Sequence, residues 1–111
     1  MTTGTGALAV PARPQPLADA LQLHAGDNVA TALRALAAGE AARVGGGGHD
    51  LQVGLSQAIP LCHKFALVAI AAGAVVTKYG EPIGRATRDI APGEHVHVHN
   101  LVSARAEDGG S

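Results

Sequence analysis

The chain has 111 residues, of which 47% are hydrophobic and 2% aromatic, and its formal net charge at pH 7 is −1. A chain of this length folds as one small domain, and its core must be built from Val, Leu, Ile and Ala. The near-zero charge and the shortage of aromatic side chains argue against nucleic-acid binding. The single cysteine, Cys62, excludes an internal disulfide and a cysteine metal cage.

Both ends of the chain have the composition of tails. Residues 1–16 contain three prolines among small residues, which favours a disordered N-terminal tail. Residues 104–111 are expected to form a flexible C-terminal tail, or the cut end of a linker. The N-terminus lacks the basic and apolar regions of a signal peptide, and no stretch approaches the roughly 20 apolar residues of a membrane span. We therefore expect a cytoplasmic domain over residues 17–103, without membrane contact.

The first element of this domain has two interpretations. Asp27 could cap a helix whose apolar stripe is Val29, Leu33 and Leu36. The same residues also fit a strand over about 28–33 that is followed by a short turn. We favour the strand, because it matches the pattern of two later segments.

Three short segments share that pattern: Leu-Ala-Ala-Gly-Glu at 36–40, Ile-Ala-Ala-Gly-Ala at 70–74 and Ile-Ala-Pro-Gly-Glu at 90–94. The second and third lead directly into β-branched runs. Glycine tolerates the left-handed conformation that ends a short helical turn, so a new strand can begin after it. We predict three units of strand, turn and strand, although short Ala/Gly pieces also recur by chance in an alanine-rich chain.

Two glycine-containing stretches are predicted to connect strands. The four glycines at 45–48 lack the Lys-Ser/Thr ending of a phosphate-binding loop, and an apparent strand follows them. A flexible hairpin connection is the better interpretation. The stretch Tyr-Gly-Glu-Pro-Ile-Gly at 79–84 is predicted to be a turn between two strands, with Pro82 helping to fix its shape.

The histidines are the residues best suited to carry chemistry. His95, His97 and His99 alternate with Val96 and Val98, so a strand here would place three imidazoles on one face and the valines on the other. Imidazole ligates metals and transfers protons near neutral pH. An exposed sheet face with polar residues would give the same alternation, so both interpretations stay open.

Other candidates also have structural alternatives. His63 precedes Lys64, which could bind a carboxylate, whereas an isolated histidine is more often a surface or hydrogen-bonded structural residue. We favour Cys62 as a small buried apolar residue, and the alternative is a reactive thiol with a basic neighbour. Glu81 either belongs to a simple turn or supports a histidine through a hydrogen bond.

Four separated motifs occur in one order: His-Ala-Gly-Asp-Asn-Val-Ala at 24–30, Pro-Leu-Cys-His-Lys-Phe-Ala-Leu at 60–67, Lys-Tyr-Gly-Glu-Pro-Ile-Gly at 78–84 and Gly-Glu-His-Val-His-Val-His-Asn at 93–100. Together they resemble the N-terminal domain of altronate and galactarate dehydratases, over nearly all of residues 20–102. That module has the SAF fold, an antifreeze-protein-like β-clip, and also occurs as a separate small subunit. The resemblance implies a mainly β domain of short strands with short helical turns.

The sequence departs from this family at two places. Cys62 stands where glycine usually precedes His-Lys, and Val68 with Ala69 replaces a more polar pair. The first departure lies directly beside His63. We therefore expect any effect of the departures at the site rather than on the fold.

The resemblance implies a role in dehydrating sugar acids, which is a carbon–oxygen hydro-lyase reaction. In the family a larger chain or domain carries the metal-dependent core, usually with iron(II) or a similar divalent ion such as manganese(II), and the small module packs against it. The reaction requires a cation on the carboxylate, a base, and an acid for the leaving water. The resemblance assigns His24, His63 and Lys64 to a shared cleft as catalytic residues.

A further set of residues is expected to contact the substrate, the metal or the larger chain. The resemblance leaves open which residues of this chain, if any, are metal ligands. The set comprises Asn28, Tyr79, Glu81, His97, His99 and Asn100.

Three functional hypotheses follow. The first is a non-autonomous dehydratase subunit that acts with a large catalytic chain on a sugar acid. The second is a binding module for sugar acid or metal that has no catalytic partner. A small subunit of a sulfo-lyase, acting on a sulfonated hydroxy acid, is a close variant of the first. The short chain and its strands with alternating faces also favour self-association or a partner, without giving a subunit number.

Overall fold

The computed structural model describes residues 18–47 and 51–103, so the predicted tails at 1–16 and 104–111 lie outside the described residues. Within these ranges the chain forms strands and turns without a helix, which confirms the expected mainly β fold. No described segment is a helix long and apolar enough to cross a membrane. The strands are β2 (Ala20–Gln22), β3 (Val29–Ala32), β4 (Ala41–Gly46), β5 (Leu51–Gly54), β6 (Lys64–Ala66), β7 (Val75–Lys78), β8 (Glu81–Ala86), β9 (His95–Val96) and β10 (Leu101–Ser103).

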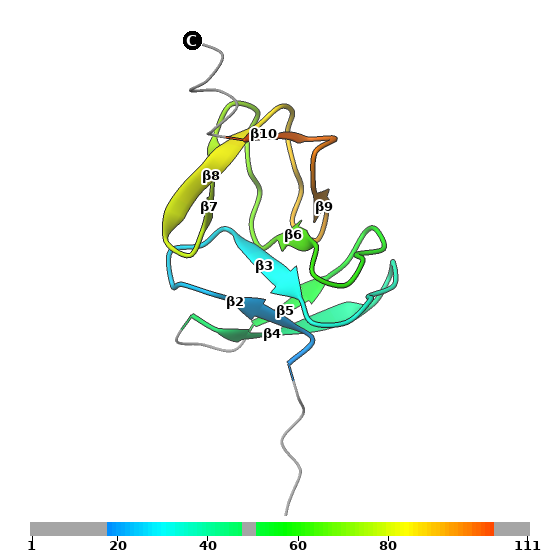
Figure 1. The fold of residues 1–111 in the computed structure, drawn as a ribbon. Helices are drawn as coiled ribbons and strands as arrows, with labels where there is room; N and C mark the ends of the chain where they lie inside the picture. Colours follow the sequence, from blue (N-terminus) through cyan, green and yellow to red (C-terminus); the bar gives the residue numbers. More distant parts are fainter. Residues whose placement is uncertain (1–17, 48–50, 104–111) are drawn as a thin grey trace, which may run out of the picture.

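The strands form two sheets, which Figure 1 shows one above the other. The larger has the order β5-β4-β2-β3-β6-β9, and the smaller has the order β10-β8-β7. The pairing of β2 with β4 is parallel, and the other strand pairs within these sheets are antiparallel. The strand interpretation of the segment after Asp27 is therefore confirmed, because this segment is β3 at the middle of the larger sheet.

Two apolar clusters form the core, and β3 contributes to both. Ala30 and Ala32 belong to a cluster centred on Phe65 and built mainly from β2 to β6. Val29 belongs to a second cluster, which also holds Val76 from the smaller sheet. Successive side chains of a strand point to opposite faces, so β3 separates the two clusters and is buried on both sides.

The three repeated segments adopt one backbone conformation. Gly39, Gly73 and Gly93 have φ between +84° and +87°, and in each turn the following N–H donates to the carbonyl three residues earlier. A four-residue hydrogen-bonded turn with glycine third, preceded in one case by Pro92, is typical of a type II β-turn. The predicted units are therefore confirmed, but the expected short helical turns are β-turns. One bond closes each turn, and the chain then enters β4, β7 or β9 directly.

The glycine run has a packing role in addition to the predicted hairpin. β4 and β5 pair as an antiparallel hairpin, and Gly45 and Gly46 lie inside β4 rather than in the connection. Gly46 has a φ of +81°, and a Cβ there would lie 2.5 Å from the carbonyl oxygen of Gln22. Glycine is therefore required where β4 passes close to β2; Gly48 lies outside the described residues.

The turn at 79–84 is shorter than predicted. It contains Tyr79 and Gly80, both at positive φ, and β8 begins at Glu81. Pro82 therefore lies in a strand, opposite Thr77, where the register shifts. Two consecutive residues at positive φ are typical of the tight turns that join antiparallel strands.

The predicted strand through the last three histidines is wrong beyond Val96. β9 contains only His95 and Val96, and residues 97–100 form a turn. Val96 is buried as expected, but the side chain of Val98 is 82% exposed. The cause is Asn100, which donates its N–H to the carbonyl of His97 and accepts the His97 N–H with its side-chain oxygen. These two bonds bend the chain away from a strand.

Candidate functional site

Three imidazole rings from distant parts of the chain lie together. His63 Nδ1 and His95 Nε2 are 2.9 Å apart, and the rings of His63 and His97 stack with centroids 4.3 Å apart. One ring nitrogen from each of the three histidines lies within 4.8 Å of the others. The exposed His99 ring lies beside His95 at 5.3 Å and is tilted. We call His63, His95 and His97 the histidine cluster.

Strand pairing and hydrogen bonds fix the backbone of this cluster. β6 pairs with β9, which places His95 opposite Phe65, two residues along the chain from His63. The side chain of Asn100 is fully buried, and its amide nitrogen donates to the carbonyl of His95 while its oxygen accepts from His97. His95 also donates its N–H to the side chain of Gln57 at 2.9 Å. The rings are therefore held together by their backbones as well as by their own contacts.

The surroundings of His95 and His97 favour neutral imidazoles. Burial, followed by the charges of His63, His99, His97 and Lys64, lowers the pKa of His95 to about 4. Burial and the same kind of cationic neighbours also lower the pKa of His97. No carboxylate in the described part of the chain forms an ion pair with these rings. Neutral rings offer lone pairs, so they suit a metal ion or a proton acceptor role.

Lys64 is a half-buried cation without a partner carboxylate. Burial, and then the charge of Lys78, lowers the pKa of its ammonium group. Lys64 forms no ion pair with any carboxylate that the structure describes. In the sheet register it lies opposite Thr31, whose buried hydroxyl has no hydrogen-bond partner. Opposite residues of an antiparallel pair share one face, so the side chains of Lys64 and Thr31 leave the sheet on the same side.

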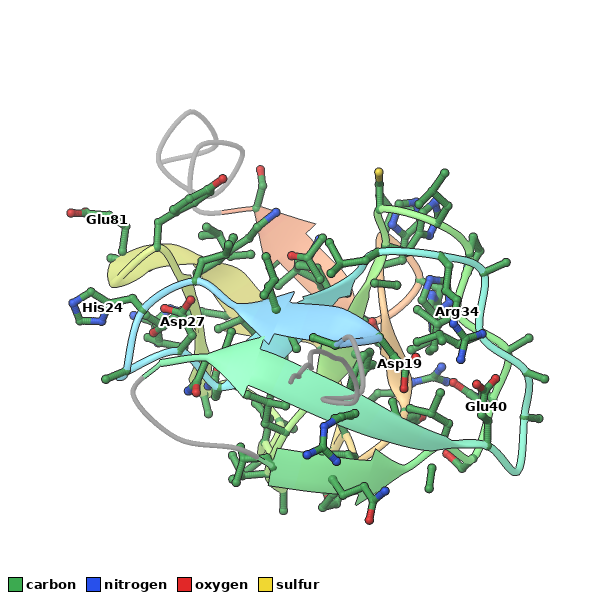
Figure 2. The ribbon with its side chains drawn as sticks, turned by 90° about the horizontal axis from the view of Figure 1, so that it is seen from below. Asp19, His24, Asp27, Arg34, Glu40 and Glu81 are labelled. Atoms are coloured by element: carbon green, nitrogen blue, oxygen red, sulfur yellow. The ribbon has the colours of Figure 1, made fainter. Side chains whose placement is uncertain are left out.

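A second polar group surrounds the buried carboxylate of Asp27. This carboxylate accepts the backbone N–H groups of His24, Tyr79 and Gly80 at 2.8–3.1 Å. Asp27 therefore holds the tight turn before β8 against the loop of His24. The Tyr79 side chain is 66% exposed, and His24 and Glu81 point outward on one side of the domain in Figure 2.

The two asparagines that were expected to bind substrate have structural hydrogen bonds. The amide of Asn28 donates to the carbonyl of Val75 and accepts the N–H of Thr77, so it joins β3 to β7. Asn100 closes the turn of the histidine cluster, as described above. A substrate contact for either residue stays a prediction, and both side chains are already engaged with the backbone.

The predicted catalytic residues do not all meet. Asp27 precedes β3, whereas the carbonyl of His63 accepts the N–H of Ala32 at the other end of β3. Four strand residues span about 13 Å, so His24 and His63 lie in separate groups. Lys64 lies between them, because its pairing partner is Thr31 and its charge acts on both His97 and the lysine of β7.

A charged cluster that sequence analysis did not predict lies on another side of the domain. Arg34 forms ion pairs with Asp19 and Glu40, away from His24 and Glu81 in Figure 2. The N–H of Arg43, and then Arg34, lower the pKa of Asp19. These ion pairs join the residues directly before β2 and β4, so the charged cluster has a structural role in the larger sheet.

Sequence reasoning grouped His95 with His97 and His99, but it could not connect His95 to His63. The two are 32 residues apart, and only the pairing of β6 with β9 brings them together. Cys62, immediately before His63, is exposed, so its interpretation as a small buried residue is wrong. Its φ of +70° explains why a glycine would suit this position.

Comparison with known proteins agrees with this geometry. The family model for the altronate/galactarate dehydratase SAF domain matches residues 18–104. Altronate dehydratase of Escherichia coli (strain K12) is 51% identical over 80 residues, which are 72% of this chain and 15% of that protein. The altronate dehydratase of Bacillus subtilis (strain 168) is 40% identical over the same length, with the same coverage.

Two smaller relatives match over about half of this chain. The (2R)-sulfolactate sulfo-lyase subunit alpha of Paracoccus pantotrophus is 43% identical over 56 residues, which are 84% of that subunit. The chain spans only about 15% of the altronate dehydratases that it matches. The family match covers every strand of the described structure. The chain therefore belongs to the SAF-domain family of altronate and galactarate dehydratases.

Proposed function

We propose that this chain is the SAF domain or small subunit of a sugar-acid dehydratase, whose active site is completed by a larger catalytic chain. The observation that carries the proposal is the half-buried Lys64, which has no carboxylate partner and lies opposite the unpaired hydroxyl of Thr31. A half-buried ammonium group without a partner, on the same sheet face as an unpaired hydroxyl, suits an incoming carboxylate. The substrates of the proposed reaction carry this group.

The proposed reaction removes a proton next to the carboxylate and expels a neighbouring hydroxyl as water. Lys64 binds the carboxylate and stabilises the charge that develops on it. His63, the next residue along the chain, takes up or donates the proton. The divalent ion, iron(II) or manganese(II), is assigned mainly to the larger chain.

Exposed apolar residues beside the cluster support a partner surface. Val98 lies between His97 and His99 and is 82% exposed, and Leu61 lies two residues before His63 and is 56% exposed. Large apolar side chains rimmed by polar groups are typical of protein contacts. The larger catalytic chain covers this face in the proposed complex. His24, Tyr79 and Glu81 form a separate polar surface, and their contact with substrate stays a prediction.

The test is reconstitution with a large dehydratase chain, followed by turnover of a panel of aldonates and aldarates. Lys64→Met should lower kcat/KM by about 10- to 150-fold, as expected for losing a charge-assisted hydrogen bond worth about 1.5–3 kcal/mol. Arg88→Gln removes an exposed cation outside the site and should leave turnover unchanged. Equal turnover in the Lys64→Met complex contradicts the proposal. Binding of a sugar acid without turnover in any reconstituted complex favours a stand-alone binding module.

A sulfo-lyase small subunit is the second candidate. The match spans 84% of the Paracoccus pantotrophus alpha subunit, so a protein of about this domain's size acts there as a separate subunit. Release of sulfite from sulfolactate in the reconstitution assay, without dehydration of any sugar acid, would favour this candidate. Lys64 would bind the substrate carboxylate in both reactions.

A further inference from the structure

We propose that His63, His95 and His97 bind one transition-metal ion of the zinc class within this small domain. This ion is additional to the divalent ion assigned to the larger chain. The inference rests on the three rings and their supports, and it does not depend on the proposed reaction.

The geometry of the cluster is close to that of a three-histidine site. Zinc binds imidazole nitrogen at about 2.0–2.1 Å, so neighbouring nitrogens of a tetrahedral site lie about 3.4 Å apart. His63 and His95 place their nitrogens at 2.9 Å, and the nitrogens of all three residues lie within 4.8 Å. To bring three donors to one ion, the stacked rings, which lie 9–24° from parallel, rotate about their side-chain bonds. The His63–His95 hydrogen bond is exchanged for two metal–nitrogen bonds.

The backbone holds the three donors before any ion arrives. His63 donates its N–H to the carbonyl of Pro60 and lies at the start of β6. His95 lies in β9, and the buried Asn100 side chain bonds to the backbone of both His95 and His97. A site whose ligands are already positioned loses less conformational entropy on binding.

The donor set selects the class of ion. The cluster offers three imidazole nitrogens, and no described carboxylate lies in the group. Magnesium and calcium prefer oxygen ligands, whereas imidazole suits zinc, copper, nickel and iron. Three protein ligands leave one tetrahedral position for water or another small ligand, which is typical of reactive rather than purely structural zinc sites.

The ion changes the role of His63. A metal-bound Nδ1 cannot carry the proton that the proposed dehydratase reaction assigns to His63, so the two assignments are separate hypotheses. Lys64 keeps its role in both, because it offers no ligand to the cluster. Metal binding is measured on the isolated protein and the role of Lys64 in the reconstituted complex, so failure of one proposal is distinguishable from failure of the other.

Calorimetric titration of the tag-free protein with zinc chloride tests the proposal, with magnesium chloride as the comparison ion. We expect one zinc ion per chain and no magnesium binding. His97→Gln and His63→Gln should each weaken zinc binding by more than about 100-fold, the upper range for changes outside the ligand shell. His24→Gln, which alters a histidine in the other polar group, should bind zinc as the unaltered protein does.

Ring-nitrogen NMR signals provide the second readout, and circular dichroism confirms that each variant is folded. Zinc should shift the signals of the three cluster histidines and leave His24 unchanged. No zinc binding by the unaltered protein overturns the proposal. Unchanged affinity in His97→Gln, or loss of affinity in His24→Gln, overturns the assignment of the ligands. If one cluster variant fails to fold, the other variant and the NMR shifts decide.

Discussion

Replacing each of two equivalent turn glycines by alanine separates backbone strain from steric overlap. Gly73 and Gly93 have the same φ of +84°, but a Cβ at Gly73 would meet no atom within 4 Å. A Cβ at Gly93 would lie 2.0 Å from the carbonyl oxygen of Gly54, where real contacts stay above 3.0 Å. Both substitutions therefore introduce the strain of a positive φ, but only Gly93→Ala also introduces a steric overlap.

The backbone strain that both substitutions introduce lowers the free energy of unfolding only slightly. A non-glycine residue in the left-handed region costs about 1–2 kcal/mol, and alanine recovers about 0.4–1 kcal/mol through the unfolded state. Gly73→Ala should therefore lower the free energy of unfolding by about 0.5–1 kcal/mol.

Gly93→Ala must also move the end of β5, at an overpacking cost of about 1–3 kcal/mol. It further disturbs the bond from the Ser56 N–H to the Gly93 carbonyl, 3.1 Å in length. We expect a total loss of about 2–4 kcal/mol.

Urea unfolding followed by circular dichroism measures both free energies of unfolding, and Gly39→Ala serves as a second control. Gly39 also has a positive φ, of +87°, and open space around it. Equal losses in Gly73→Ala and Gly93→Ala, within about 0.5 kcal/mol, would refute the reasoning, because that spread is expected of unrelated surface changes.

Three further predictions concern the positive φ of Cys62 and two buried or bridged carboxylates. Cys62→Gly should raise the free energy of unfolding by about 0.5–1 kcal/mol, because it relieves a left-handed residue; Leu61→Gly in the same turn should lower it, and a loss in both variants would contradict the strain argument. The Asp27 carboxylate accepts three backbone N–H groups, so Asp27→Asn should lower the free energy of unfolding by about 1–3 kcal/mol. Hydrogen exchange at the Tyr79 amide should accelerate. Unchanged protection of that amide would count against the role of Asp27. Hydrogen bonding from a backbone N–H lowers the pKa of Asp19 below its ordinary 3.8, so its stabilisation is complete above that pH and is lost as the pH falls through the lowered pKa. Asp19→Asn should therefore be less stable at pH 7 and lose less stability between about pH 4 and 2, and parallel pH profiles in urea titrations would exclude this contribution.

The fold was accessible from sequence because its signals are local. The glycines of the three repeated turns specify the same reversal each time, and the pattern shared with the two later segments favoured a strand over a helix at β3. The strand through the last histidines was not predictable from alternation alone. The decisive interaction is the side chain of Asn100, whose two backbone bonds outweigh the β propensity of Val98.

The candidate site was only partly predictable from the sequence. His63 and Lys64 were identified by their motif, but the contact of His63 with His95 depends on pairing between β6 and β9. His24 carries an equally good motif and lies at the opposite end of β3, because sequence order does not reveal distance in space. The roles of Asp27 and Asn28 as connectors of β3 to the smaller sheet also need the three-dimensional contacts.

The order in which strands pair has a consequence for folding kinetics. β3 pairs with β6, and β6 pairs with β9, although long stretches of chain separate them (Figure 1). Loop-closure entropy opposes such pairings until late in folding. His63 and His95 therefore meet only after both loops have closed, and a ligand that requires both rings binds the folded chain alone. By mass action, a higher concentration of that ligand stabilises the folded state. The region around His63 and His95 then opens less often to proteases.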